Sequence, residues 1–526
     1  MTRTSTRIPF YVVFFLLVMN AAGAQVNKSD SLALVDLYNN TGGNKWTRHA
    51  NWLTTAPVAS WEGITVDRQK VTVIYLAGNN LKGKLPASFG NLDSLVSLYL
   101  NGNDLQGGLP QSFSKLMHLG TWIMSDNPNL GARLTSAIGN LVNLQFVRLD
   151  NTGTKGSLPK EIGRLTQLSY LDISKCALTG KLPSAIGKLS QLQTLTLATN
   201  SLSGTLPSSV GNLSNLRYLG LNNNQFSGSL PASGNLPLLQ TLLLNNNEFS
   251  GSFPGWFSKA ASLYTIDISH NGFTGTIPDE LQNITNFYSF TASYNHFSGI
   301  APGWLFNKHF LFDVYLDHNE LTQPDNSVCI QTGSTTDYLD ISNNRYTFNG
   351  LECINADNFF YFIAPQAPIS IHLYNNGLAV SAGGTLSNNT YKWYKVGASG
   401  SRTIVGDSTI TPNQSGSYYA KVTNASVPTL TLYTDTFVYT KSAVTAQPAS
   451  LFVYPNPARN SIRVSGLNAG VNVKIAVADL TGYVWMTTMS QRQAVVLMDV
   501  SRLKSGSYLL AVTDGREVRT MPFVKE

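Results

Sequence analysis

Between Val71 and Tyr346, the apolar and polar positions of the chain follow one recurring pattern, L-x-x-L-x-L-x-x-N-x-L-x-G-x-L-P. A clear copy is LRYLGLNNNQFSGSLP, which runs from Leu216 to Pro231. We count twelve copies spaced 23 to 25 residues apart, and the two at the C-terminal end are degenerate. Each L-x-L alternation predicts a short strand with its leucines on one face. The pattern therefore predicts a stack of similar coils.

The asparagine of each copy follows the strand, where the chain must turn. A turn inside a stack buries backbone N–H and C=O groups, and each group left unpaired costs about 1–3 kcal/mol. A side-chain amide supplies both donors and an acceptor. In the triplet Asn222, Asn223 and Asn224, we predict that Asn224 points inward and pairs the backbone of two coils, while the other two lie on the rim. The predicted ladder positions are Asn79, Asn103, Asn127, Cys176, Asn200, Asn224, Asn247, Asn271, Asn295, Asn319 and Asn344.

Two copies depart from this ladder. Thr152 stands at the asparagine position in the fourth copy, where we expect the ladder to be weaker. Cys176 stands there in the fifth copy, and we predict a buried thiol.

The pattern resembles the leucine-rich repeat, and its S-G-x-L-P half resembles the plant-type subclass. The resemblance covers residues 71–349 and implies a second short strand after each turn and a right-handed superhelical stack. A stack needs capped ends. Residues 25–70 are the predicted N-terminal cap, with a helix from Ser29 to Gly43 that offers Leu32, Leu34, Val35 and Tyr38 to the open end. Trp46, Trp52 and Trp61 resemble a plant-type cap that lacks its cysteine pairs.

The chain has three cysteines, too few for a disulfide-built scaffold. Cys329 and Cys353 lie 24 residues apart, which is one repeat. Stacking would place them one coil apart, at about 4.8 Å, which a disulfide can bridge. A Cys329–Cys353 disulfide and two unpaired thiols both remain open. Residues 350–364 are the predicted C-terminal cap and linker.

In residues 365–440 the spacing of apolar positions no longer follows the repeat. The stretches NTYKWYKVG (from Asn389) and SGSYYAKVTN (from Ser415) alternate as strands do. Trp393, together with Tyr418 or Tyr419, resembles the core tryptophan and tyrosine corner of immunoglobulin-like sandwiches. Residues 441–450 read as a linker.

Residues 451–526 resemble the C-terminal sorting domain of type IX secretion in Bacteroidota. The specific stretches are YPNPARN, Tyr454 to Asn460, and SGSYLLAVTDG, Ser505 to Gly515. The resemblance implies export, passage through the outer membrane by the type IX secretion machinery, and release or attachment at the surface. An ordinary terminal sandwich is the alternative. The predicted fold is mostly β with short helical or 3-10 turns, a leucine-rich repeat solenoid followed by two small β-sandwich domains.

Residues 1–24 read as a signal peptide, because Arg3 and Arg7 precede an apolar stretch and small residues at Ala22 to Ala24. An uncleaved anchor is the alternative, but the apolar stretch is shorter than the roughly 20 residues that a spanning helix needs. We expect no transmembrane anchor in the mature chain. The net charge of +7 falls to +5 without these two arginines, and no run of Lys or Arg points to nucleic acid.

The sequence suggests no catalytic residues, cofactor or metal site. His270 and His318 lie two repeats apart, about 10 Å in the stack, and read as solvated rim residues. The acidic positions Asp267, Asp313 and Asp317, with Asp340, read as a solvated face, with a calcium site as the alternative.

The outward positions of the strands are the candidate binding surface. Aromatic residues and arginine dominate interface energies, although aromatic residues also suit strands for their own sake. The candidate ligand-binding residues are Phe146, Arg148, Tyr170, Asp172 and Tyr218. We hypothesise a secreted or surface-exposed protein that binds a protein or glycan on its concave strand face. The alternatives are an adhesion or matrix component without a defined ligand, and a secreted enzyme acting on polysaccharides.

Overall fold

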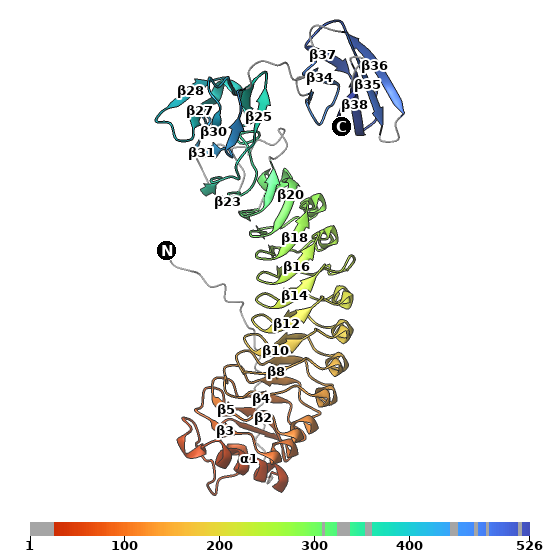
Figure 1. The fold of residues 1–526 in the computed structure, drawn as a ribbon. Helices are drawn as coiled ribbons and strands as arrows, with labels where there is room; N and C mark the ends of the chain where they lie inside the picture. Colours follow the sequence, from red (N-terminus) through yellow and green to blue (C-terminus); the bar gives the residue numbers. More distant parts are fainter. Residues whose placement is uncertain are drawn as a thin grey trace. The chain divides into compact units, whose positions relative to one another are not determined.

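The computed structural model describes residues 26–307, 311–322, 337–352, 360–441, 451–467, 472–479, 483–513 and 518–526. The chain forms two compact units, one ending at Ala367 and the other beginning at Pro368. The first contains the repeats as a curved stack of coils, and the second contains antiparallel sheets (Figure 1).

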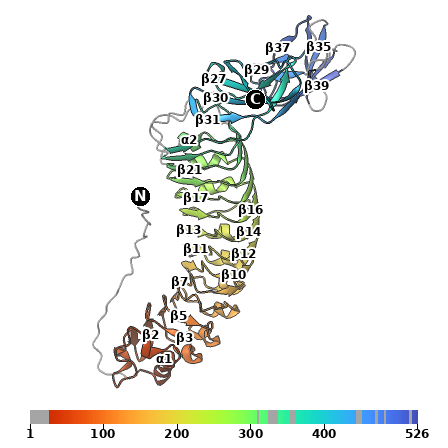
Figure 2. The ribbon, with the colours of Figure 1, turned by 60° about the vertical axis from the view of Figure 1, so that its left-hand side comes forward.

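Each repeat contributes one short strand to a long sheet, called here the first sheet. It has 14 strands, of which the first pair is antiparallel and the others are parallel. The first sheet lines the inner side of the bend (Figure 2). Its strands are β1 (Ile64–Asp67), β2 (Lys70–Tyr75), β4 (Ser97–Tyr99), β6 (Thr121–Ile123), β7 (Phe146–Arg148), β9 (Tyr170–Asp172), β11 (Thr194–Thr196), β13 (Tyr218–Gly220), β15 (Thr241–Leu243), β17 (Thr265–Asp267), β19 (Ser289–Thr291), β21 (Asp313–Tyr315), β23 (Tyr338–Asp340) and β24 (Phe360–Phe362).

A second strand follows most turns. These strands form a two-stranded sheet, β3 (Lys82–Lys84) and β5 (Asp104–Gln106), and an eight-stranded sheet. The break falls in the third copy, where the sequence has an extra residue near Pro128 and only an isolated bridge joins Arg133 to Lys155. The eight strands are β8 (Lys155–Gly156), β10 (Ala177–Gly180), β12 (Ser201–Gly204), β14 (Gln225–Gly228), β16 (Glu248–Gly251), β18 (Gly272–Gly275), β20 (His296–Ile300) and β22 (Glu320–Thr322).

Short helices complete most coils. In most repeats the proline of the motif is the N-cap of a 3-10 turn, and its extended backbone ends the preceding segment there. The leucines of the motif, such as Leu219 and Leu221, are buried between the layers. The helical segments of the repeats are η3 (Ala87–Asn91), η4 (Gln111–Lys115), η5 (Ser136–Asn140), η6 (Lys160–Arg164), η7 (Ser184–Lys188), η8 (Ser208–Asn212), η9 (Gly255–Lys259), η10 (Asp279–Asn283) and α2 (Trp304–Asn307).

The inward amides join each coil to the one before it. Asn224 Nδ2 donates to the carbonyl of Leu221 in its own coil and to that of Leu197 in the preceding coil, both at 3.0 Å. Its Oδ1 accepts from the N–H of Leu202, also at 3.0 Å. Each amide therefore closes its own turn and fixes the coil before it. The same bonds recur at Asn103, Asn127, Asn200, Asn247, Asn271, Asn295, Asn319 and Asn344.

The residue before each ladder position has left-handed backbone. Asn223 has φ 56°, and the equivalent residues of all twelve copies have φ between 52° and 67°. Asparagine and glycine adopt this conformation at low cost. The triplet Asn222 to Asn224 thus has distinct tasks, since Asn223 makes the turn and Asn224 bonds the coils. The glycine of S-G-x-L-P has the same requirement, with φ 73° at Gly228.

The two substituted positions behave differently. Thr152 is fully buried, and its hydroxyl donates to the Leu149 carbonyl at 2.6 Å. Cys176 is only half-buried, so the prediction of a buried thiol is wrong. Its Sγ lies 3.3 Å from the Leu149 carbonyl, which keeps the bond to the preceding coil. The N–H of Leu178 donates to the amide oxygen of Asn200 in the next coil. Among the described residues, no N–H donates to the Cys176 thiol in this way.

Helix α1 (Lys28–Asn40) caps the N-terminal end of the stack. It buries Ala33, Leu34 and Leu37, whereas Leu32, which we expected to cover the open end, is exposed. The three tryptophans of the cap pack against one another, with ring centroids 4.9 Å and 4.8 Å apart. The remaining turns of the cap are η1 (Gly43–Lys45) and η2 (Val58–Ser60).

The first sheet continues one strand beyond the twelve copies. Strand β24 pairs in parallel with β23, and Gln366 occupies the next ladder position. Gln366 Nε2 donates to the carbonyls of Ile341 and Ile363 at 2.9 Å and 2.6 Å, and its Oε1 accepts from the N–H of Asn344 at 3.2 Å. The segment that we predicted as a cap and linker, residues 350–364, therefore includes a further strand. Cys329 and Cys353, and with them the predicted disulfide, lie outside the described residues.

The second unit consists of antiparallel sheets. Residues 368–441 form a three-stranded sheet and a larger sheet around Trp393, which is 1% exposed. The Tyr418 hydroxyl donates to the Gln414 carbonyl at 2.8 Å, so Tyr418 rather than Tyr419 holds the corner. The strands are β25 (Ile371–Tyr374), β26 (Gly377–Val380) and β29 (Thr409–Ile410), then β27 (Asn389–Lys395), β28 (Ser401–Val405), β30 (Gly416–Asn424), β31 (Val427–Tyr433) and β32 (Phe437–Tyr439), with η12 (Leu386–Asn388) between β26 and β27.

The last residues form two further antiparallel sheets around a common apolar core. Tyr508 repeats the contact of Tyr418, since its hydroxyl donates to the carbonyl four residues earlier, that of Lys504. The strands are β33 (Phe452–Tyr454), β34 (Ser461–Ser465) and β37 (Val495–Asp499), then β35 (Val473–Asp479), β36 (Val484–Ser490), β38 (Gly506–Thr513) and β39 (Val518–Lys525).

We predict that Asn224→Ala lowers the free energy of unfolding by about 1–3 kcal/mol, because it leaves buried backbone groups of two coils unpaired. Urea denaturation measures the loss, and hydrogen exchange should be faster at the Leu202 amide. Asn222→Ala in the same turn is the control and should change little. Equal effects of the two substitutions would contradict the ladder.

We further predict that Cys176→Asn stabilises the protein by about 1 kcal/mol, because an amide of similar size adds an acceptor and a second donor at this position. Cys176→Ser, which adds no second donor, is the control. A lower melting temperature for the asparagine variant than for the serine variant would refute the prediction.

Candidate binding face on the first sheet

The strand register places the outward side chains of the first sheet in two rows. One row contains Tyr75, Tyr99, Arg148, Asp172 and Tyr315, because each of these residues ends its strand. The other row lies two residues earlier and contains Phe146, Tyr170 and Tyr218. Strands in a sheet lie about 4.8 Å apart, so side chains within a row touch their neighbours. The five predicted binding residues thus fall on the three strands β7, β9 and β13.

Phe146 and Tyr170 form a stacked pair. Their ring centroids are 4.2 Å apart and their planes differ by 7°. Burial raises the pKa of Tyr170 to about 12, and the nearby Asp172 carboxylate acts in the same direction. The ring edges and the phenol hydroxyl are therefore the parts of this pair available to a ligand.

Arg148 is not a free cation. Its Nε donates to Asp150 Oδ1 at 2.9 Å, which we did not predict from the sequence. Asp172 is 8% exposed, and its Oδ1 accepts from the N–H and the hydroxyl of Ser174 at 2.9 Å and 2.7 Å. Burial is the main cause that raises the pKa of Asp172. These two predicted residues are thus held by local bonds and shape the surface around the ring pair.

Tyr218 lies apart from the stacked pair, separated from Tyr170 by Thr194 of β11. Its ring lies close above Gly220. A Cβ added at Gly220 would meet the ring at 2.9 Å and the Thr196 hydroxyl at 3.0 Å. Glycine at this outward position therefore makes room for the ring of Tyr218.

The C-terminal half of the face contains further aromatic columns that our sequence analysis did not single out. One runs from Tyr264 to Tyr288 to Phe312, with centroids 4.7 Å and 4.8 Å apart. It borders a surface hollow that Gln240 and Asn286 also line. A second column runs from Tyr315 to Tyr338 to Phe362, with centroids 4.7 Å and 5.5 Å apart. Comparing each position across repeats would have revealed the first column, whose members all directly precede a strand. The second column alternates between two repeat positions, because Tyr315 and Phe362 end their strands and Tyr338 begins its strand.

Carboxylates surround the second column. Burial raises the pKa of Tyr315 to about 12, and the charges of Asp313 and Asp340 add to this effect. The pKa of Asp313 is raised by burial and by the neighbouring Asp337. Among the described residues, none of these three carboxylates forms an ion pair. Within the described residues, this part of the face therefore combines tyrosines with carboxylates that form no ion pair.

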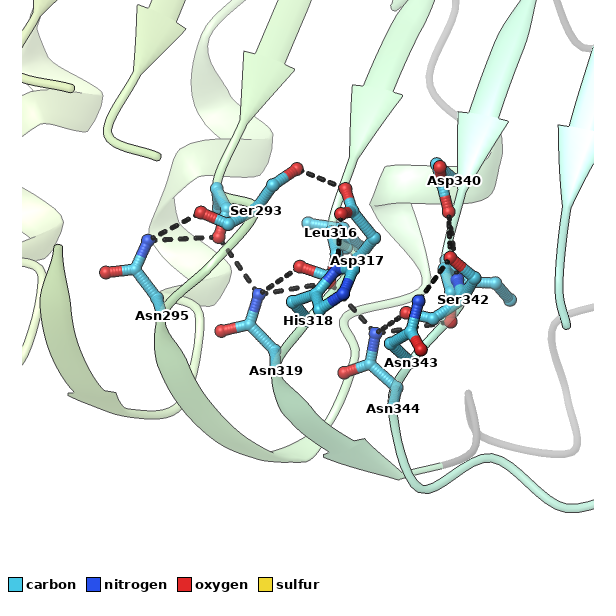
Figure 3. Close-up of polar contacts among 12 residues, drawn as sticks. Ser293, Asn295, Leu316, Asp317, His318, Asn319, Asp340, Ser342, Asn343 and Asn344 are labelled. Atoms are coloured by element: carbon cyan, nitrogen blue, oxygen red, sulfur yellow. Dashed lines mark hydrogen bonds and ion pairs between the residues drawn. The ribbon is translucent and has the colours of Figure 1, made fainter. Parts of the chain in front are cut away.

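The rim beside these strands has a third stack, His270, Tyr294 and His318, with centroids 4.3 Å and 3.9 Å apart. His318 Nδ1 lies 2.8 Å from Asp317 Oδ2, and the Ser293 hydroxyl donates to the other oxygen of Asp317 (Figure 3). The carboxylate thus lies between the hydroxyl and the imidazole. In a nucleophilic triad the imidazole occupies that middle position, so this arrangement does not activate Ser293.

Two of the acidic residues that we considered as calcium ligands accept hydrogen bonds from nearby serines. Asp267 and Asp340 accept from Ser269 and Ser342, in the pattern seen at Asp172. Within the described residues, no three His, Cys, Asp or Glu side chains are placed to hold a metal ion.

Family profiles match both parts of the chain. The profile described as "Leucine-rich repeat region" matches residues 123–214, and "Leucine Rich Repeat" matches residues 70–92, 94–116, 215–235, 238–260 and 262–284. The profile described as "Secretion system C-terminal sorting domain" matches residues 452–526. The protein is a leucine-rich repeat protein with a secretion sorting domain. The predicted leucine-rich repeats and the predicted sorting domain are therefore confirmed. The sorting domain indicates a secreted or outer-membrane surface protein. No helix of the described residues has the length and apolarity to cross a membrane.

Solved plant receptors resemble the repeat region. The ectodomain of the Arabidopsis thaliana receptor kinase GASSHO1/SCHENGEN3, in complex with CASPARIAN STRIP INTEGRITY FACTOR 2, aligns with TM-score 0.57 and 26% identity over 65% of this chain and 44% of that chain. A TDR receptor aligns with TM-score 0.50 and 29% identity over 56% and 51%. The leucine-rich repeat protein thus spans about half the length of these structures. No curated protein sequence matches it significantly.

We predict that Asp172→Asn melts at an equal or higher temperature than the wild type at pH 7. Burial raises the pKa of Asp172 in the folded state, so its ionised form costs stability there. The destabilisation disappears as the pH falls through the pKa of the folded state towards that of the unfolded state. The difference in melting temperature between Asp172→Asn and the wild type should therefore shrink between pH 7 and pH 4. Thermal melts across this range measure it, and a clearly lower melting temperature at pH 7 would contradict the assignment.

Proposed function

We propose that the protein is a secreted or surface-exposed, non-enzymatic binding protein that recognises a protein or glycan through the concave face of its first sheet. The observation that supports this is the concentration of stacked aromatic side chains and ionisable groups on one sheet face. Such residues dominate the energy of protein interfaces. The stacks involve outward side chains on neighbouring strands, so they add nothing to the buried leucine core.

The two halves of the face differ in chemistry. Around Phe146 and Tyr170, the charges of Arg148 and Asp150 are paired, which suits a ligand bound through ring edges and hydroxyls. Around Tyr315 and Tyr338, unpaired carboxylates favour a ligand with basic groups. We therefore propose that a single extended ligand contacts both halves and places its basic groups near β21 and β23.

The plant receptor GASSHO1/SCHENGEN3 supports this proposal by analogy, since its repeat ectodomain was solved with CASPARIAN STRIP INTEGRITY FACTOR 2. The two proteins share the repeat architecture.

The test is binding of the full secreted chain to a peptide library and to a glycan array. We expect the double variants Phe146→Ala/Tyr170→Ala and Tyr315→Ala/Tyr338→Ala each to weaken binding by about tenfold or more, as loss of interface aromatics does. The control is Lys160→Ala/Lys188→Ala, in the 3-10 turns η6 and η7, which should bind as the wild type does.

Unchanged binding of both aromatic variants would refute the concave face as the site. Binding that never saturates and is not competed would instead support the adhesion or matrix role. Turnover of any arrayed polysaccharide would overturn the non-enzymatic assignment.

A further inference from the structure

A second surface lies on the sandwich that follows the repeats, on the sheet formed by β28, β27, β30 and β31 (Figure 1). One face of this sheet packs into the core through Tyr391, Trp393, Val422 and Leu432, all at most 1% exposed. Side chains alternate between faces along a strand. The opposite face therefore presents the intervening residues, which are Ser401, Thr403, Val405, Thr390, Lys392, Tyr394, Ser417, Tyr419, Lys421, Thr423, Thr431 and Tyr433, with Val438 of β32 beside Ser417. We call this set the lysine–tyrosine face.

The centre of the lysine–tyrosine face holds two lysines directly opposite each other. Lys392 on β27 pairs in register with Lys421 on β30. Like charges in this position destabilise a sheet. No acidic residue occurs on this face, and among the described residues neither lysine forms an ion pair. The two positive charges therefore have no anionic partner in the part of the chain that the structure describes.

Tyrosines surround these charges. The Lys392 ammonium lies 5.6 Å from the centroid of Tyr394, and that of Lys421 lies 5.8 Å from Tyr394 and 5.1 Å from Tyr433. Such contacts contribute about 0.5–1 kcal/mol each at an exposed site, and they leave the positive charge in place. They also fix the ammonium groups above the sheet instead of letting them extend into solvent. The geometry is that of a preorganised anion site with hydroxyl groups around it.

We propose that the lysine–tyrosine face binds an anionic polysaccharide. The two lysines take a sulfate or carboxylate group, and the phenol and threonine hydroxyls bond to sugar hydroxyls. The sorting domain brings this sheet outside the cell, where such polymers are found in solution or on surfaces.

Single-stranded nucleic acid fits this face less well. Proteins that bind it use free aromatic faces on which bases stack. Here Tyr394 and Tyr419 cover each other, with centroids 4.8 Å apart and planes 7° apart, and the lysines cover further ring faces. Two cations are also few, since phosphate contacts supply most of the affinity for nucleic acid.

The experiment compares binding of the full secreted chain to dextran sulfate, to unsubstituted dextran and to oligothymidylate by affinity electrophoresis. We expect dextran sulfate to bind, dextran not to bind, and the affinity to fall as ionic strength rises. Lys392→Gln/Lys421→Gln should weaken dextran sulfate binding by about tenfold or more, because each lysine supplies a charge-assisted bond.

The matched control is Lys395→Gln/Lys441→Gln, which removes the same charge from the same sandwich. These two lysines donate to Gln414 and to the Asn413 carbonyl, away from the lysine–tyrosine face. The control variant should keep its affinity. The Lys392→Gln/Lys421→Gln variant should stay folded and melt close to the wild type, because removal of the like-charge pair offsets part of the lost cation–π contacts.

Equal losses in the two variants would overturn the proposal, since the binding would then reflect net charge alone. Equal binding of dextran and dextran sulfate would overturn it as well. Tighter binding of oligothymidylate, lost in the face variant, would assign the face to nucleic acid instead. The variant Tyr315→Ala/Tyr338→Ala should bind dextran sulfate as the wild type does, so failure here is independent of the concave face of the repeats.

Discussion

The repeat region depends on the bonds that the inward amides make to turns buried between coils. Each turn after a first-sheet strand exposes carbonyls and an N–H group to the interior, where water cannot satisfy them. One asparagine bonds three carbonyls and one N–H of two successive coils, as Asn224 does for the carbonyls of Leu197, Leu221 and Asn222 and the N–H of Leu202. A coil by itself has no such partner, so the amides make the stability of each coil depend on its neighbour. Side-chain amides also bond the backbone at both ends of the stack. Asn79 bonds the backbone of Arg48 in the N-terminal cap, and Gln366 continues the ladder at the C-terminal end.

Much of this architecture could be predicted from one sequence, because repetition turns weak local signals into a strong one. The period, the first-sheet strands and the inward amide all follow from leucine spacing and hydrogen-bond accounting. Strand β24, which follows the twelfth copy, was missed because Tyr361, Ile363 and Gln366 replace the motif residues. Gln366 makes the hydrogen bonds that asparagine makes in the other coils, but a search for asparagine at this position does not find it. The boundaries that we assigned to the separate domains remain predictions.

The candidate site was less predictable, because it depends on side-chain conformations. The sequence placed Arg148 and Asp172 on the face but could not show that Asp150 pairs with one and Ser174 bonds the other. The left-handed position before each ladder residue was also missed. At Tyr294, where φ is 55°, a bulky residue adopts a conformation that is unfavourable for it, and its ring is sandwiched between two histidines. All three rings of the rim stack stand on left-handed positions, since His270 and His318 have φ 52° and 55°.

Stacking determines what kind of recognition the first sheet can offer. Parallel strands in register bring side chains at one repeat position within about 4.8 Å of each other. Aromatic residues in a row then lie ring against ring, as Tyr264, Tyr288 and Phe312 do. The ring faces that contact each other are closed within the column, whereas Tyr264 at its end is 47% exposed. Ring faces inside a column are closed to a ligand, so recognition of the kind proposed above would rely on hydrogen bonds, ring edges and charge. In that proposal, the uneven distribution of carboxylates along the sheet sets the direction of the ligand.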